Sequence, residues 1–179
     1  MTRLALSAIG RDRPGIVAAM TAVLLRHGVN IEDSQMAILR GHFTMTLILA
    51  PPAELDREAL ARELDEQAAA LGLEALALSG IEPVSAATPE PTHLATIYGV
   101  DHPGIVHAAT RTLAELGVNI TDLNTQLVAS GDDQPLYALL MEIVVPADIE
   151  VGALEQALAA SAELESVELS LRELEHHEL

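Results

Sequence analysis

DRPGIV at residues 12–17 returns as DHPGIV at residues 101–106, with one substitution between the two. At the same offset of 89 residues, GVNI at 28–31 meets GVNI at 117–120, and Asp33 meets Asp122. So many identities in one register indicate an internal duplication, with about 85 residues in each copy. We therefore expect two similar domains.

The residues around the first motif predict a strand, a helix and a hairpin. Residues 2–10 alternate and are rich in aliphatic side chains, as in a half-buried strand. Pro14 suits the first turn of a helix of about four turns, which Asp12 would cap and Gly28 would follow. Residues 29–40 and 42–50 predict two strands joined by a tight turn at 40–42. Glu54–Leu71 predicts a second helix, and residues 73–79 predict a fourth strand.

The second copy predicts the same order. Strands are expected at 92–99, 118–129, 136–145 and 166–174, and helices at 103–116 and 148–161. Its hairpin loop, SGDDQP at 130–135, is longer than the turn in the first copy.

These elements predict an α+β chain of two tandem ferredoxin-like βαββαβ domains, each a four-stranded antiparallel sheet with its helices on one face. We expect domains at 1–82 and 93–173, a proline-rich linker at 83–92 and a tail at 174–179. The other face and the edges of each sheet need cover or pairing, which a tandem copy can supply.

Composition narrows the classes of function. The net charge is −18, with no Lys, so we expect no direct binding of nucleic acid. No Cys occurs, which excludes disulfides, thiolate metal sites and a Cys nucleophile. The start of the chain does not resemble a signal peptide and no apolar run could span a bilayer, so we expect a cytoplasmic protein without a membrane partner.

The segments 12–36 and 101–127 resemble the signature region of ACT domains, small effector-binding modules that often attach to enzymes of amino-acid metabolism. The resemblance covers nearly the whole chain, twice. A pair of such domains without an attached enzyme is most similar to repressors of the glycine cleavage system. The resemblance implies a regulatory protein that binds a small effector, an amino acid, and acts through a protein partner such as a transcription factor.

In ACT domains the effector typically lies between two domains, so the motif loop of one copy is expected to face the Asn-containing strand of the other. Backbone N–H groups at the helix start would bind a carboxylate, and an Asn amide can both donate and accept. The residues so implied are Asp12, Arg13, Pro14, Gly15, Ile16, Asn30 and Ile31, and, in the second copy, Asp101, His102, Pro103, Gly104, Ile105, Asn119 and Ile120.

Structural roles compete with this interpretation. Asp12 and Asp101 are typical helix caps, Pro14, Gly15 and Gly28 are typical helix boundaries, and Asn30 and Asn119 suit turns. Because His102 replaces Arg13, the two sites need not be equivalent.

Catalysis is disfavoured by the motifs. Glycine-rich phosphate loops and nucleophile elbows do not occur. His102 and His107 are five residues apart and are expected on different helix faces, unlike a helical metal pair. We expect no enzyme activity, no metal and no cofactor. The alternative to the effector-binding regulator is a constitutive interaction and oligomerisation module without a ligand. Because the sheet edges are exposed, we expect a homo-oligomer in either case.

Overall fold

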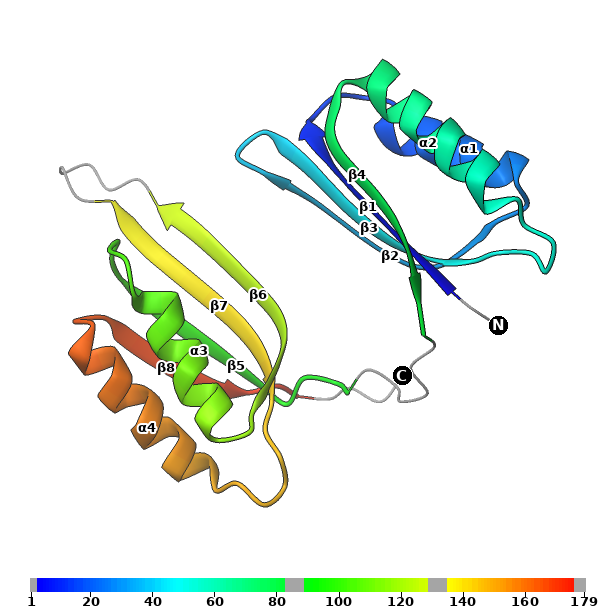
Figure 1. Cartoon of the computed structure of the whole chain (residues 1–179). Helices are drawn as coiled ribbons and strands as arrows, with labels where there is room; N and C mark the ends of the chain where they lie inside the picture. The colour runs from blue at the N-terminus through cyan, green and yellow to red at the C-terminus, as the bar shows by residue number, and fades with distance from the viewer. Residues whose placement is uncertain (1–2, 83–88, 129–134, 176–179) are drawn as a thin grey trace. The chain divides into compact units, whose positions relative to one another are not determined.

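The computed structural model describes residues 3–82, 89–128 and 135–175, and its chain forms two units, Met1–Ala86 and Ala87–Leu179. In each unit two helices cover one face of a four-stranded antiparallel sheet (Figure 1). The predicted ferredoxin-like βαββαβ fold is thus confirmed in both copies. Parts of the expected linker (83–88), second hairpin loop (129–134) and tail (176–179) lie outside the described residues.

The first unit runs in the order β1, α1, β2, β3, α2, β4. Its strands are β1 (Arg3–Arg11), β2 (Asn30–Leu39), β3 (His42–Ala50) and β4 (Leu73–Ile81), and its helices are α1 (Ile16–Arg26) and α2 (Arg57–Leu71). The sheet order is β2-β3-β1-β4, with β1 and β3 in the centre. The predicted tight turn is Arg40-Gly41, and both residues have positive φ, as a two-residue hairpin turn requires.

The second unit repeats the topology. Its strands are β5 (His93–Val100), β6 (Asn119–Val128), β7 (Leu136–Val144) and β8 (Glu168–Glu173), in the sheet order β6-β7-β5-β8. Its helices are α3 (Ile105–Glu115) and α4 (Val151–Leu164).

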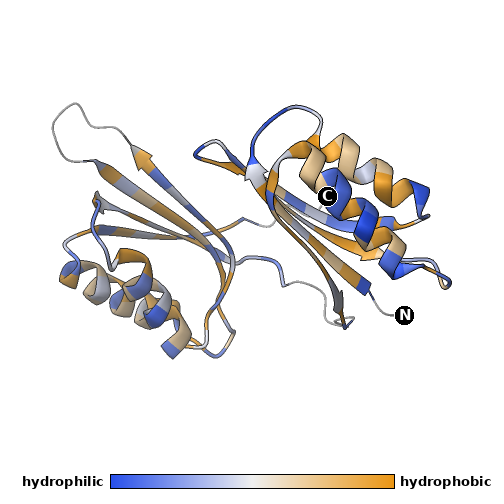
Figure 2. Cartoon of the chain, turned by 45° about the horizontal axis from the view of Figure 1, so that its top comes forward, coloured by the Kyte–Doolittle hydropathy of each residue, from blue (hydrophilic) through white to orange (hydrophobic). Residues whose placement is uncertain are grey.

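The core of each unit lies between its sheet and its helices. Strand β3 buries Phe43, Met45, Leu47 and Leu49 on that face, as its period-two pattern predicts. The helices contribute residues at helical spacing, such as Leu60 and Leu64 of α2. The hydropathy of the chain follows this division, with apolar and polar residues alternating along the strands (Figure 2). Burial of aliphatic side chains therefore fixes which face of each sheet receives the helices.

The repeated GVNI segment ends the first helix and starts the next strand. Gly28 has φ 65° and follows α1; its N–H donates to Leu25 O at 3.0 Å and that of Val29 donates to Leu24 O at 2.9 Å. Gly117 and Val118 repeat both bonds after α3. This is the Schellman cap, in which a left-handed glycine satisfies the last carbonyls of a helix. Gly28 is therefore a helix boundary, which is the structural role that the sequence predicted for it.

Helix starts differ from the prediction. Helix α1 begins at Ile16, not at Pro14, and it spans 11 residues, about three turns rather than four. Its N-cap is Gly15 and no side chain caps it, so the prediction that Asp12 caps this helix is wrong. The same correction applies to Asp101 and α3, whose N-cap is Gly104. The positive φ of each glycine turns the chain between the aspartate and the helix, so the aspartate does not reach the first amides.

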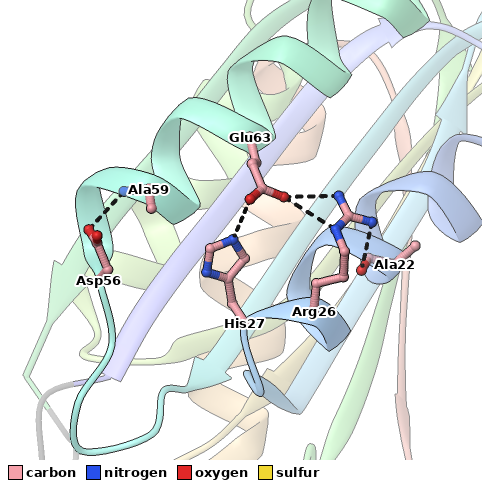
Figure 3. A network of polar contacts seen from close by, with 6 residues as sticks. All are labelled: Ala22, Arg26, His27, Asp56, Ala59 and Glu63. Atoms are coloured by element: carbon pink, nitrogen blue, oxygen red, sulfur yellow. Dashed lines mark hydrogen bonds and ion pairs between the residues drawn. The ribbon is translucent and has the colours of Figure 1, made fainter.

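Helix α2 also begins later than predicted, at Arg57, because Asp56 is its N-cap. Asp56 Oδ1 accepts a hydrogen bond from Ala59 N at 2.9 Å (Figure 3). An aspartate in this position satisfies an otherwise free amide and sets the first residue of the helix.

Candidate functional site

The Asp-x-Pro-Gly segments form the loops between the first strand and the first helix of each unit. Asp12 N donates to Gly41 O at 3.0 Å, which holds the first loop against the β2–β3 turn. Asp101 N donates to Pro135 O at 3.1 Å, so the second loop is held in the same way. Gly15 and Gly104 then reverse the chain with φ values of 97° and 121°, where a side chain would be strained.

The first amides of α1 and α3 lack a side-chain cap. The first backbone bonds within these helices are Ala19 N to Gly15 O at 2.9 Å and Ala108 N to Gly104 O at 2.8 Å. The three amides before Ala19 and Ala108 therefore have no partner within their helix. Helix α4 also lacks a side-chain cap, so a free helix start alone does not distinguish these loops.

The second loop borders an open hollow of about 640 Å³, a size typical of ligand pockets. Five of the residues that the family resemblance implies line it together: Asp101, His102, Pro103, Gly104 and Ile105. Val106, His107 and Tyr137 complete the wall. The uncapped start of α3 thus borders a space large enough for a small metabolite.

Both signs of charge meet beside this hollow. His102 Nε2 lies 2.8 Å from Glu165 O, and its Nδ1 lies 3.2 Å from Pro103 O and 3.6 Å from the Glu165 carboxylate. The hydrogen bond to the Glu165 carbonyl, then that to the Pro103 carbonyl, raises the pKa of His102 above its ordinary 6.5, and the charges of Glu165 and Asp101 add to this. The loop therefore combines backbone amides, an imidazole with a raised pKa, and carboxylates.

The Asn residues lie away from these loops within their own unit. Asn30 and Asn119 are exposed at the beginnings of β2 and β6, across the length of the helix from the Asp-x-Pro-Gly loop. Asn30 and Ile31 instead border a hollow of about 500 Å³ beside α1, lined largely by apolar residues. The structure therefore does not bring Asn30 or Asn119 to the motif loop of the same copy.

A bulge gives the Asn-Ile step a structural role in both copies. The pairing of β2 with β3 shifts by one residue between Ile31 and Asp33, and that of β6 with β7 shifts between Ile120 and Asp122. Because the bulge occurs at the same place in both sheets, it is a regular part of this fold, and it bends the edge strand. Ile31 and Ile120 both pack against the core of their unit.

Sequence reasoning missed four residues of the second site. Val106 and His107 directly follow the motif, whereas Tyr137 and Glu165 come from β7 and the end of α4. Of Tyr137 and Glu165, only Tyr137 stands out in the sequence, because the chain has two tyrosines. The expectation that His102 and His107 lie on different helix faces is wrong, because His102 precedes α3 and both line one hollow.

Among the described residues, no group of three or more His, Asp and Glu side chains could hold a metal ion. None of the described helices is long and apolar enough to cross a membrane.

Comparison with known families matches the ACT domain model to residues 2–76 and again to residues 92–172. The phosphoserine phosphatase SerB2 of Mycobacterium tuberculosis is 28% identical over 168 residues, which are 92% of this chain and 39% of the phosphatase. The chain thus spans about two fifths of that enzyme. The glycine cleavage system transcriptional repressor of Escherichia coli is 45% identical over 47 residues, 26% of this chain and 25% of the repressor.

Two solved structures share the whole tandem. A protein of Galdieria sulphuraria superposes with a TM-score of 0.76 at 25% identity, covering 97% of this chain and 98% of that one. A protein assigned as a glycine cleavage system transcriptional repressor superposes with a TM-score of 0.67 at 19% identity, covering 98% of each chain. The second likeness shows a shared fold.

Proposed function

The chain belongs to the ACT domain family, and on that premise we propose that it is a regulatory protein that binds an α-amino acid at its Asp-x-Pro-Gly loops and acts through a protein partner. Two family matches, which together cover most of the chain, support the regulatory, effector-binding part. The identity of the effector class rests on the chemistry of the second loop.

The observation that carries the proposal is the hollow beside residues 101–105, which the uncapped start of α3 borders. These amides, at the positive end of the α3 dipole, suit a carboxylate group. The Asp101 carboxylate, on the wall of the same hollow, suits an ammonium group. A zwitterionic amino acid presents both groups and has no net charge.

The charge of the whole protein favours a zwitterion over a simple anion. With a net charge of −18, the surface repels free anions and phosphate backbones. A zwitterion has no net charge, so the overall charge of the protein does not repel it. The same argument favours a protein as the downstream partner over a direct contact with DNA, in line with the repressor-like relatives.

A thermal-shift screen of the full chain against the twenty amino acids tests the proposal. A ligand that binds only the folded state raises the melting temperature, by an amount that grows with ligand concentration. We expect at least one amino acid to do so. Asp101→Asn should weaken that effect, whereas the exposed control Asp148→Asn, between β7 and α4, should leave it unchanged. Absence of a shift with all twenty would contradict an amino-acid effector.

A constitutive interaction module is the second candidate, favoured by the edge strand β2. Met36, Ile38 and Leu39 of this strand expose between 51% and 60% of their surface. An exposed apolar edge can pair with another strand, for example in a second copy of the chain. Analytical ultracentrifugation distinguishes the two candidates. If this module is the function, the chain forms a dimer without ligand, Ile38→Lys dissociates it, and Leu25→Lys on α1 does not.

A further inference from the structure

Each motif loop is tied to the end of the second helix of its own unit by the residue after the aspartate. In the first unit, Arg13 Nη2 donates to Ala70 O at 3.0 Å, in the last turn of α2. In the second unit, His102 Nε2 donates to Glu165 O at 2.8 Å, directly after α4. The contact therefore survives the exchange of Arg for His, and we call it the loop anchor.

A cation is the suitable donor for this anchor. The last carbonyl groups of a helix have no partner within the helix and lie at the negative end of its dipole. A positively charged N–H donor satisfies one of them and is stabilised by the dipole. The anchor is thus a tertiary contact: its two residues are 57 positions apart in the first unit and 63 apart in the second.

Both ring nitrogens of His102 face hydrogen-bond acceptors. Nε2 faces the carbonyl of Glu165 and Nδ1 faces the carbonyl of Pro103. A carbonyl oxygen only accepts, and a neutral imidazole donates from one nitrogen only. Only the imidazolium makes both bonds, so deprotonation leaves one nitrogen lone pair opposite a carbonyl oxygen.

The other charged groups around His102 favour the same state. The Glu165 carboxylate lies 3.6 Å from Nδ1, and the charge of Asp101 also acts on the ring. Glu165 also packs over the loop, because a Cβ on Gly104 would lie 3.1 Å from its Oε2. His107 and Tyr137 are the other titratable groups on the wall of the hollow. If His102 were neutral, the carboxylates of Glu165 and Asp101 would lose the positive charge beside them.

We propose that His102 is a positioning residue that makes the second loop sensitive to pH, whereas Arg13 keeps the first loop anchored at every pH at which the protein is folded. A guanidinium keeps its charge over this range, but an imidazolium does not. The sense of the change follows from the raised pKa of His102: both ring hydrogen bonds are made below the ordinary value of 6.5, and one of them is lost as the pH rises through the higher folded value, which weakens the anchor. The consequence for effector binding rests on the proposed function, but the anchor itself does not.

Hydrogen–deuterium exchange of the full chain, without any ligand, tests the anchor. The amides of Asp101 and Ala108 are bonded at the two ends of the second loop, and those of Asp12 and Ala19 are their equivalents in the first. After correction for intrinsic rates, we expect protection at Asp101 and Ala108 to fall as the pH rises from 6 through the folded pKa of His102, by about tenfold for each unit by which folding raises the pKa. Protection at Asp12 and Ala19 should stay constant.

Three variants assign the effect to the side chain. His102→Arg should make the second loop insensitive to pH, and Arg13→His should make the first loop sensitive. His107→Gln, which removes the neighbouring imidazole, should leave the fall in protection unchanged. If the second loop of His102→Arg keeps the fall of the wild type, or if NMR shows a neutral His102 ring at pH 6, the anchor proposal is wrong.

Binding data separate this proposal from the proposed function. If the second loop loosens at pH 8 and no amino acid binds at either pH, the anchor stands and the effector proposal fails. If an amino acid binds and the exchange at Asp101 and Ala108 does not depend on pH, the anchor proposal fails and the effector proposal stands.

Discussion

The Arg26 guanidinium lies 3.0 Å from the Glu63 carboxylate and joins the last turn of α1 to α2 (Figure 3). His27 Nε2 lies 3.1 Å from the other carboxylate oxygen of Glu63. At the offset of 89, the second copy has Glu115 and Leu116 at the positions of Arg26 and His27. This link therefore belongs to the first unit alone, and it distinguishes the two copies as clearly as the exchange of Arg13 for His102.

Removal of this link should change the acid stability of the protein. The hydrogen bonds from Arg26 and then His27 lower the pKa of Glu63 below its ordinary 4.5. The stabilisation is thus present above about pH 4.5 and is lost as the pH falls through the lower folded value. We expect Glu63→Gln to lower the melting temperature by no more than a few degrees at pH 7, since the groups are exposed, and to match the wild type at low pH. An equal difference at both pH values would contradict this assignment.

The ends of the second helices offer a matched pair of backbone substitutions. Gly72 after α2 and Ser166 after α4 occupy the same left-handed position, with φ values of 65° and 56°. A residue with a side chain is strained there by roughly 1–2 kcal/mol, whereas glycine is not. We expect Ser166→Gly to raise the free energy of unfolding by up to about 1 kcal/mol and Gly72→Ser to lower it, in urea titrations. A destabilised Ser166→Gly would show that the Ser166 side chain has a role that backbone geometry does not explain.

The core of the first unit should respond to a cavity. Leu64 of α2 is fully buried against the sheet. Its truncation removes apolar contacts and leaves a space that the close-packed surroundings fill only in part, so we expect Leu64→Ala to cost about 2–5 kcal/mol. Leu25→Ala on α1 is the control: 79% of this side chain is exposed, and the cost should be small. Circular dichroism during urea unfolding measures both.

A close contact limits side chains in the central strand of the second unit. A Cβ on Gly99 would lie 2.6 Å from Val167 Cγ1, just before β8. Gly99→Ala should therefore destabilise the protein, by roughly 1–3 kcal/mol as for other overpacked sites. Val167→Ala in the same chain should recover part of the loss in thermal unfolding. If Val167→Ala does not recover any stability, the contact with Val167 is not the cause of the destabilisation.

The sequence alone predicted the fold because its signals are local. The period of two in residues 43–49 and the repeated glycines after the first helices each determine a nearby element. The site was only partly predictable, since Tyr137 and Glu165 reach the loop at 101–105 through tertiary contacts across the hairpin and from α4. The cap role assigned to Asp12 failed because Gly15 has a positive φ and turns the chain between the aspartate and the helix, and a cap-and-helix pattern does not specify that turn.

Binding of an amino acid at the motif loops is tested most directly by ¹H–¹⁵N NMR of the full chain during titration with the amino acid that gives the largest thermal shift. We predict saturable shifts at the amides of Ile105, Val106 and His107, with smaller changes in Asp101→Asn. The amides of Ile16 to Ala18 report in the same spectrum whether the first loop also binds. Shifts confined to other parts of the chain, with residues 101–107 and 12–18 unchanged at saturation, would contradict the account.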